Sequence, residues 1–216
     1  RRFLGTALGS AASLNLLSGF VKGQGTAANG KLNLAFIGAG GRAGANIDGC
    51  AATGQTVYAL CDVDKARADG AYKKFPEAKV YTDWREMLEK EGGRIDSINA
   101  SVPDHMHTLI ALTAMQAGKH VYCQKPLCHD VAECRALSRA ARRAGVVTQL
   151  GTQHAAGVGD RLGVQWLREG VIGAVKRVIL CSNRPGAIDD YRLVGPRPAK
   201  GEPVPAHLAW DLWLGT

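Results

Sequence analysis

The stretch Gly38-Ala39-Gly40-Gly41-Arg42-Ala43 constrains the fold of this chain more than any other part of its sequence. It directly follows the apolar run 32–37 and opens a helical pattern, which is the setting expected of a G-x-G-x-x-A turn. In such a turn Gly38 allows the tight bend, Gly40 lets the backbone approach a pyrophosphate, and Ala43 permits close packing of helix on strand. The stretch therefore predicts the first strand, turn and helix of a dinucleotide-binding domain.

A carboxylate at the end of the next β-rich run extends this pattern. Asp62 lies 19 residues beyond Ala43, where a carboxylate accepts hydrogen bonds from both hydroxyls of an adenosine ribose. Gly41 and Arg42 open the intervening helix, whose N–H groups and dipole favour a pyrophosphate. NAD is favoured over NADP, because the Asp62 carboxylate repels a 2′-phosphate and no basic residue stands directly beside it in the sequence. Asp64 remains an alternative ribose ligand, although its position also predicts a helix N-cap.

Short β-rich runs alternate with helical patterns along the chain, as in parallel βαβ units. We expect strands at 32–37, 56–61, 79–81, 95–100, 120–123 and 146–150. Asp83 and Asp130 are each followed three residues later by Glu, which predicts a capping box at two helix N termini. The pattern predicts an α/β fold, with a doubly wound parallel Rossmann sheet over residues 31–150 and the beginning of an α+β second domain over 151–216.

Further polar residues follow the fourth and fifth predicted strands. Ser101, Pro103 and His107 follow the fourth strand, and Gln124 and Lys125 follow the fifth. In an open parallel sheet the ligand lies outside the carboxyl ends of the strands, so we expect all five residues at the nicotinamide end of the crevice. Taken singly, Lys125 also fits a solvated surface lysine, and His107 fits a helix-start histidine that bonds a backbone group.

In order and spacing, these motifs resemble those of the family named after glucose-fructose oxidoreductase, inositol dehydrogenase and MocA (Gfo/Idh/MocA). The matching motifs are the glycine turn, Asp62-Val63-Asp64, Pro103 with His107, and Gln124-Lys125-Pro126 in place of the usual Glu-Lys-Pro. Residues 170–173 and a strand expected at 174–182 resemble the entry into the family's second domain. The stretch 203–213 resembles an exported, twin-arginine subgroup that commonly carries Gln in the signature.

The resemblance implies a chemistry as well as a fold. It implies that Lys125 contacts a substrate hydroxyl and moves its proton while hydride passes between a sugar carbon and the nicotinamide of NAD. Gln124 departs from the family pattern, because a neutral amide lacks the charge with which Glu favours the protonated lysine. The family's substrate-facing helix carries a catalytic Asp and His, which we expect beyond Thr216, in a longer protein that forms a homo-oligomer.

Three functions remain open at this point. The first, which the motifs favour, is an NAD-dependent oxidoreductase acting on a small sugar, polyol or cyclitol. The second is an NAD-dependent glycosidase or related eliminase, in which transient oxidation of a sugar hydroxyl acidifies the neighbouring C–H and NAD is regenerated. The third is a dinucleotide-binding protein without catalytic activity.

Residues 1–30 predict an export signal of the twin-arginine type. Arg1-Arg2-Phe3-Leu4 precedes a run of small and weakly apolar residues, and the pattern fits if one further Arg comes before it. Thr26-Ala27-Ala28 resembles a cleavage site, so we expect a periplasmic protein whose mature chain begins near residue 29 or 30. The alternative is an N-terminal tail on a cytoplasmic protein.

Composition argues against several other classes of protein. The formal net charge of +8 suits anionic partners, but the basic residues are dispersed without a zinc-finger, RRM or basic-zipper pattern, so nucleic acid is not expected. No run reaches the roughly 18 apolar residues of a membrane span. The six cysteines lack paired C-x-x-C spacing. Four histidines near them lack a recognisable carboxylate partner, so we expect no metal site: His105, His107, His129 and His154.

Overall fold

The computed structural model describes residues 30–153, 155, 157–181 and 200–215. The chain divides into two units. The first comprises the described residues up to Gly151 together with 207–215, and the second lies within 152–206. The predicted export signal lies outside the described residues, apart from Gly30.

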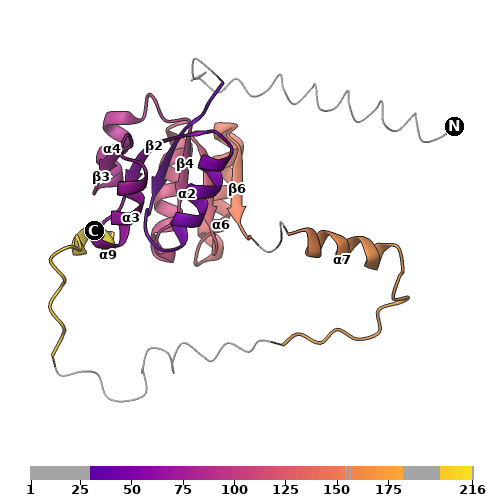
Figure 1. Cartoon of the computed structure of the whole chain (residues 1–216). Coiled ribbons are helices and arrows are strands. Elements are labelled where there is room, and N and C mark those ends of the chain that lie inside the picture. Colours follow the sequence, from indigo (N-terminus) through magenta and orange to yellow (C-terminus); the bar gives the residue numbers. More distant parts are fainter. Residues whose placement is uncertain (1–29, 154, 156, 182–199, 216) are drawn as a thin grey trace. The chain divides into compact units, whose positions relative to one another are not determined.

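A parallel six-stranded sheet forms the centre of the first unit, in the order β3-β2-β1-β4-β5-β6 (Figure 1). Its strands are β1 (Asn33–Ile37), β2 (Thr56–Cys61), β3 (Lys79–Tyr81), β4 (Ser97–Ala100), β5 (His120–Gln124) and β6 (Thr148–Gly151). Each lies within two residues of its expected bounds. Residues 34–37 of β1 are all buried, as expected of a parallel strand covered on both faces. The predicted doubly wound Rossmann sheet is confirmed.

Helices cover both faces of this sheet (Figure 1). They are α2 (Arg42–Ala52), α3 (Lys65–Lys74), α4 (Trp84–Glu91), α5 (His107–Gln116) and α6 (Val131–Ala144), with the short 3-10 helix η1 (Asp104–Met106) before α5. On one face α2 and α3 pack around Phe36 and Ile47. On the other face α4, α5 and α6 pack around Met87, Ile110 and Leu137. Among the described helices, none combines the length and the hydropathy needed to cross a membrane.

The predicted capping boxes differ between α6 and α4. At α6, the Asp130 side chain accepts a hydrogen bond from the backbone N–H of Glu133, and the Glu133 carboxylate accepts one from the backbone N–H of His129. Asp83 caps α4, but Glu86 pairs with a lysine one turn later. Both N-caps are therefore present, but neither helix completes a capping box, because Glu133 accepts from the residue before the α6 N-cap and Glu86 does not return to the α4 N-cap.

The residues after β6 correct two expectations. Helix α7 (Val158–Arg168) belongs to the second unit. The strand expected at 174–182 is absent from the described residues 174–181, where Leu180 is 94% exposed. An apolar run forms a strand only against a hydrogen-bonding neighbour, and none is present there among the described residues. Residues 207–215, which include α9 (Trp210–Leu214), belong with the Rossmann unit and not with a second domain over 151–216.

Candidate functional site

A cavity of about 490 Å³ lies at the carboxyl ends of β1, β2 and β4. Six of the residues predicted to bind a cofactor line it: Gly38, Gly40, Arg42, Asp62, Ser101 and Pro103. The sheet order reverses between β1 and β4, which is where open α/β sheets bind their ligands. The volume of this cavity also falls within the range of small-molecule sites, about 300–1,000 Å³.

The glycine turn requires the small residues that it carries. Gly38 has a φ of +86°, and a Cβ built on it would lie 2.2 Å from the carbonyl oxygen of Ser101. A Cβ on Gly40 would lie 2.8 Å from the carbonyl oxygen of Arg67. Ala43 is fully buried where α2 packs on the sheet. The turn therefore brings the backbone closer to its neighbours than any larger residue allows.

The N terminus of α2 suits an anionic group. No side chain caps it within the described structure, and its first turn contains no acidic residue. No carboxylate of that turn therefore offsets the positive end of the helix dipole. The guanidinium of Arg67 lies against the same turn, since a Cβ on Gly41 would stand 2.9 Å from Arg67 Nη2. These residues fit a dinucleotide pyrophosphate.

Arg67 is a residue of this site that the sequence did not single out. Sequence analysis found no basic residue beside Asp62, but Arg67 lines the same cavity. Arg67 lies in the first turn of α3, three residues after the N-cap Asp64, and helical geometry returns it to the strand end. The sequence signal for Arg67 is therefore its helical spacing from the N-cap Asp64, and not a position next to Asp62.

Asp62 has a second role that the sequence did not reveal. Its Oδ2 accepts hydrogen bonds from the backbone N–H groups of Ala39 at 2.8 Å and Gly40 at 3.0 Å, and its Oδ1 accepts one from Asp64 at 2.9 Å. The carboxylate thus ties the glycine turn to the end of β2. A carboxylate has about four acceptor positions, so capacity remains for a ribose hydroxyl.

Asp64, the alternative ribose ligand, is engaged elsewhere. Its Oδ1 accepts a hydrogen bond from the Arg67 backbone N–H and lies 3.0 Å from Nδ1 of His207. Burial opposes ionisation of this carboxyl, but the bonds from Arg67 and His207 outweigh it and lower the pKa of Asp64. The arrangement favours Asp62 over Asp64 for the ribose.

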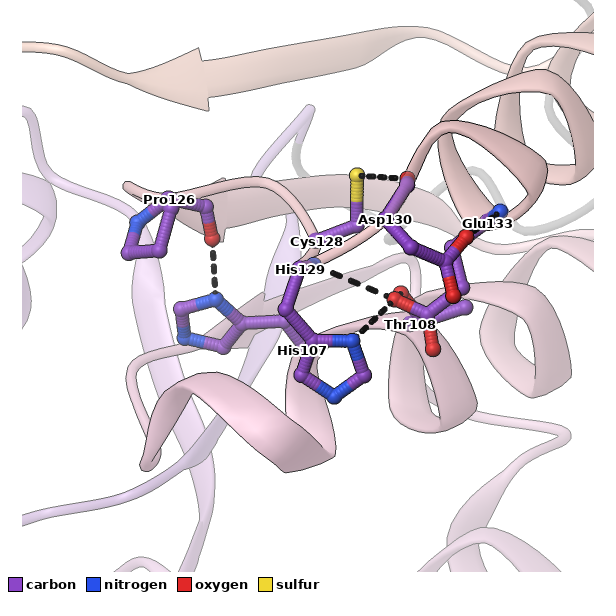
Figure 2. Close-up of polar contacts among 7 residues, drawn as sticks. All are labelled: His107, Thr108, Pro126, Cys128, His129, Asp130 and Glu133. Carbon is purple, nitrogen blue, oxygen red and sulfur yellow. Dashed lines mark hydrogen bonds and ion pairs between the residues drawn. The ribbon is translucent and has the colours of Figure 1, made fainter.

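His107 is buried beneath the loops that follow β4 and β5. Its Nδ1 faces the carbonyl oxygen of Pro126 (Figure 2). Its Nε2 lies 2.9 Å from the carbonyl oxygen of Val102. The side chain does not reach the cavity lining. Of the two sequence interpretations, the structure shows the backbone-bonding histidine.

Gln124 and Lys125, the first two residues of the Gln-Lys-Pro motif, lie apart from this cavity. Gln124 is buried, with Oε1 3.5 Å from Asn46 Nδ2, and the same Nδ2 donates to Ser101 Oγ at 2.9 Å. Lys125 is exposed at the end of β5. The cavity lining includes neither residue. The polar contacts of Asn46 nevertheless connect the end of β5 to the end of β4.

A group of three potential metal ligands has an explanation within the fold. Among the described residues, His129, Asp130 and Glu133 bring one ligand atom each within 4.8 Å of one another (Figure 2). Glu133 Oε2, however, accepts hydrogen bonds from Thr108 Oγ1 and the His129 backbone, and lies 2.9 Å from His129 Nδ1. These contacts cap α6. They also correct the expectation that His129 lacks a carboxylate partner.

The contribution of the C-terminal segment 207–215 to this site was not predicted from the sequence. Leu208, Trp210, Leu212 and Trp213 line the same cavity as Asp62. The signal in the sequence was the W-x-x-W spacing, which carried only a family resemblance and no role in the site.

Relatives with established names match part of this chain. The inositol 2-dehydrogenase of Salmonella typhimurium is 33% identical over 94 residues, which cover 43% of this chain and 27% of that enzyme. The alpha-N-acetylgalactosaminidase of Shewanella oneidensis is 32% identical over 113 residues, which cover 48% of this chain and 24% of that protein. The chain therefore spans about a quarter of the length of these relatives.

A solved structure and a family model also match this chain. The myo-inositol 2-dehydrogenase of Lactobacillus plantarum superposes with a TM-score of 0.61 at 26% identity, over 67% of this chain and 43% of that one. Residues 32–152, more than half of the chain, match the model of the Gfo/Idh/MocA oxidoreductase family, described as an NAD-binding Rossmann fold. The chain belongs to the Gfo/Idh/MocA family of oxidoreductases, and its Rossmann domain binds NAD.

Proposed function

We propose that the protein to which this chain belongs transfers hydride between a hydroxyl-bearing carbon of a sugar, polyol or cyclitol and NAD. The observation that carries this proposal is the Asp62 carboxylate, which organises the glycine turn inside the cavity where a ribose would lie. The glycine turn and Arg67 would hold the pyrophosphate, and Asp62 the adenosine ribose. NAD supplies the hydride acceptor when it is bound.

Lys125 is our proposed acid/base residue. It directly follows β5, at the carboxyl edge of the sheet, and its exposed ammonium can reach a substrate that lies outside that edge. As the neutral amine, Lys125 would accept the proton that leaves the substrate hydroxyl, and as the ammonium it would return that proton in the reverse direction. We assign His107 a positioning role, because its ring holds the loops on both sides of this region through Val102 and Pro126.

The test uses the complete protein, NAD and a panel of cyclitols, polyols and sugars. NADH formation is followed by absorbance, and products are identified by mass spectrometry. Stoichiometric NADH and a ketone product are expected for at least one compound class. Tight NAD binding without NADH formation on any member of the panel would contradict this proposal and favour a silent dinucleotide-binding protein.

A redox-assisted glycosidase is the second candidate, because the Shewanella oneidensis relative is a glycosidase. In that case the sugar is oxidised only transiently, which acidifies the neighbouring C–H and permits loss of the leaving group. Aryl glycosides distinguish the two functions. Release of the aryl group with no net NADH supports the glycosidase, whereas NADH accumulation without cleavage supports the dehydrogenase.

We also propose that the protein is exported to the periplasm and forms a homo-oligomer. The support for export is the sequence pattern at residues 1–28, which the structure does not describe. Replacing Arg1→Lys together with Arg2→Lys, in a chain with one Arg added before them, should block delivery to the periplasm. Unchanged delivery would reject the twin-arginine interpretation. Light scattering of the complete protein tests its oligomeric state.

A further inference from the structure

The segment 207–215 is fixed to the end of β2 by backbone contacts. Leu208 forms an antiparallel β-bridge with Asp64, and the backbone N–H of Ala209 donates to the carbonyl oxygen of Val63 at 2.8 Å. Val63 directly follows Asp62, the proposed ribose ligand. One end of the segment is therefore anchored beside the ribose position.

The other end of the segment is anchored across the cavity, beyond β4. Nε2 of His105 lies 2.8 Å from the carbonyl oxygen of Trp213, and the His105 and Trp213 rings are 5.3 Å apart between centroids. His105 lies in η1, after the end of β4. The segment thus passes over the carboxyl edge of the sheet from β2 to β4.

Between these anchors the segment presents a flat aromatic surface. Trp210 and Trp213 stack with centroids 5.1 Å apart and an angle of 4° between their planes, and both line the cavity. Trp210 is still 41% exposed. A partly exposed, stacked indole pair at a cavity wall offers a π-face to a planar ligand.

The remaining walls show which half of the dinucleotide this cavity suits. Asp62 and Val63 directly follow β2, Val102 lies in the loop after β4, and Ile110 lies in α5. Lys125, which follows β5 where we expect the nicotinamide, is not part of the lining. An apolar cavity beside the ribose carboxylate suits an adenine base.

We propose that Trp210 and Trp213 form the outer wall of the adenosine half of the NAD site and hold the adenine through aromatic contact. The inference rests on the NAD site described above. It assigns a nucleotide-binding role to a segment that lies outside the part of the chain matched by the family, residues 32–152. The ligand class is an adenine nucleotide, of which AMP is the smallest useful probe.

Calorimetry of the chain with AMP, NAD and nicotinamide mononucleotide tests the proposal. Trp210→Ala with Trp213→Ala should weaken AMP and NAD binding by about 10-fold, the scale of base–aromatic stacking, and leave nicotinamide mononucleotide unaffected. Trp210→Phe with Trp213→Phe should restore most of the affinity, because phenylalanine retains a π-face. Trp166→Ala is the matched control, an exposed tryptophan in the second unit.

Each outcome decides a separate point. Unchanged AMP affinity in the double alanine variant overturns the role of the indole pair, and equal losses for AMP and nicotinamide mononucleotide overturn its restriction to the adenosine half. Thermal unfolding without nucleotide shows whether the alanine variant folds. If it does not fold, the AMP affinity of the phenylalanine variant and acrylamide quenching of the unmodified chain test the proposal instead. AMP must then protect the tryptophan fluorescence of the unmodified chain from acrylamide; lack of protection overturns the proposal.

The proposed function fails separately from this inference. Loss of AMP affinity in the alanine variant together with no hydride transfer by the complete protein would leave the aromatic wall in place and remove the oxidoreductase. No NAD or AMP binding by the unmodified chain would remove the site itself.

Discussion

The buried imidazole of His107 hydrogen-bonds the backbone carbonyl of Pro126, and so joins the start of α5 to the loop that follows β5. The second ring nitrogen lies 2.9 Å from the carbonyl oxygen of Val102, in the loop that follows β4. One fully buried side chain therefore spans the two loops at the carboxyl edge of the sheet. Lys125, the proposed acid/base residue, directly precedes Pro126.

Replacing His107→Ala should lower the free energy of unfolding by about 3 kcal/mol, because a loop carbonyl oxygen loses the ring N–H that donates to it and the fully buried side chain leaves a cavity. His107→Gln should recover part of this loss, since its amide can still donate to one carbonyl. Urea denaturation measures both values. The control is His129→Ala, whose exposed ion pair contributes little. An alanine variant as stable as the unmodified chain would show that the bridge contributes no net stability.

Gly38→Ala should abolish NAD binding and destabilise the fold. A positive φ costs an alanine about 1–2 kcal/mol, and the new Cβ would also meet the Ser101 carbonyl oxygen at 2.2 Å. Gly54→Ala separates the two effects, since Gly54 has a φ of +79° but no heavy atom within 4 Å of the new Cβ. Calorimetry with NAD and thermal unfolding should show the larger loss only at Gly38. Equal losses of stability and NAD affinity at Gly38 and Gly54 would contradict the argument that Ser101 lies too close to Gly38 to admit a Cβ.

Asp62 should select NAD over NADP. Asp62→Ala should weaken NAD binding about 10-fold or more, because charge-assisted hydrogen bonds to the turn and to the ribose are lost together. The same change should narrow the preference for NAD over NADP. Asp62→Ser with Val63→Arg should shift the preference towards NADP. Asp64→Asn, which retains an N-cap acceptor, should leave the preference unchanged. Equal affinity of the unmodified protein for NAD and NADP would reject the ribose assignment.

Lys125→Met in the complete protein should lower turnover by about 100- to 10,000-fold, the usual contribution of a positioned acid/base group. NAD affinity should change little, because the residues that we propose hold the pyrophosphate and the adenosine ribose, Gly38, Gly40 and Asp62, lie elsewhere. In the direction of ketone reduction, where Lys125 donates the proton, Gln124→Glu should move the basic limb of the pH–rate profile to higher pH, because a carboxylate favours the protonated lysine. Near-normal turnover in the methionine variant would exclude the role. Loss of NAD binding would make Lys125 a cofactor contact.

The cysteines should differ sharply in their rate of alkylation. Burial raises the pKa of the Cys123 thiol to about 12 and also raises the pKa of Cys61. A higher pKa leaves less thiolate at mildly alkaline pH, so both should resist iodoacetamide until the chain unfolds. Cys134 and Cys181 are exposed and should react first. Peptide mass spectrometry after timed labelling tests this order, and rapid labelling of Cys61 in the folded chain would contradict it.

The strands and the glycine turn were predictable because their signals are local. Apolar runs and turn residues placed each strand within two residues of its observed bounds. The strand expected at 174–182 failed because the local pattern carries no information about a pairing partner. The contact of Arg67 with the turn was missed because it depends on how α3 returns to the end of β2. The bonds of Asp62 to the turn were missed because they depend on the register in which β1 pairs with β2. The docking of Trp210 was missed because its neighbours are remote in sequence.

The contact between His207 and Asp64 joins residues 143 positions apart. Closing so long a loop costs more chain entropy than joining neighbouring strands, and contacts of this kind form late in folding. We therefore expect the sheet to assemble first and the segment 207–215 to dock afterwards. The same segment should be the first to detach in native-state hydrogen exchange. Its opening, without unfolding of the sheet, would then set the rate at which a nucleotide enters and leaves.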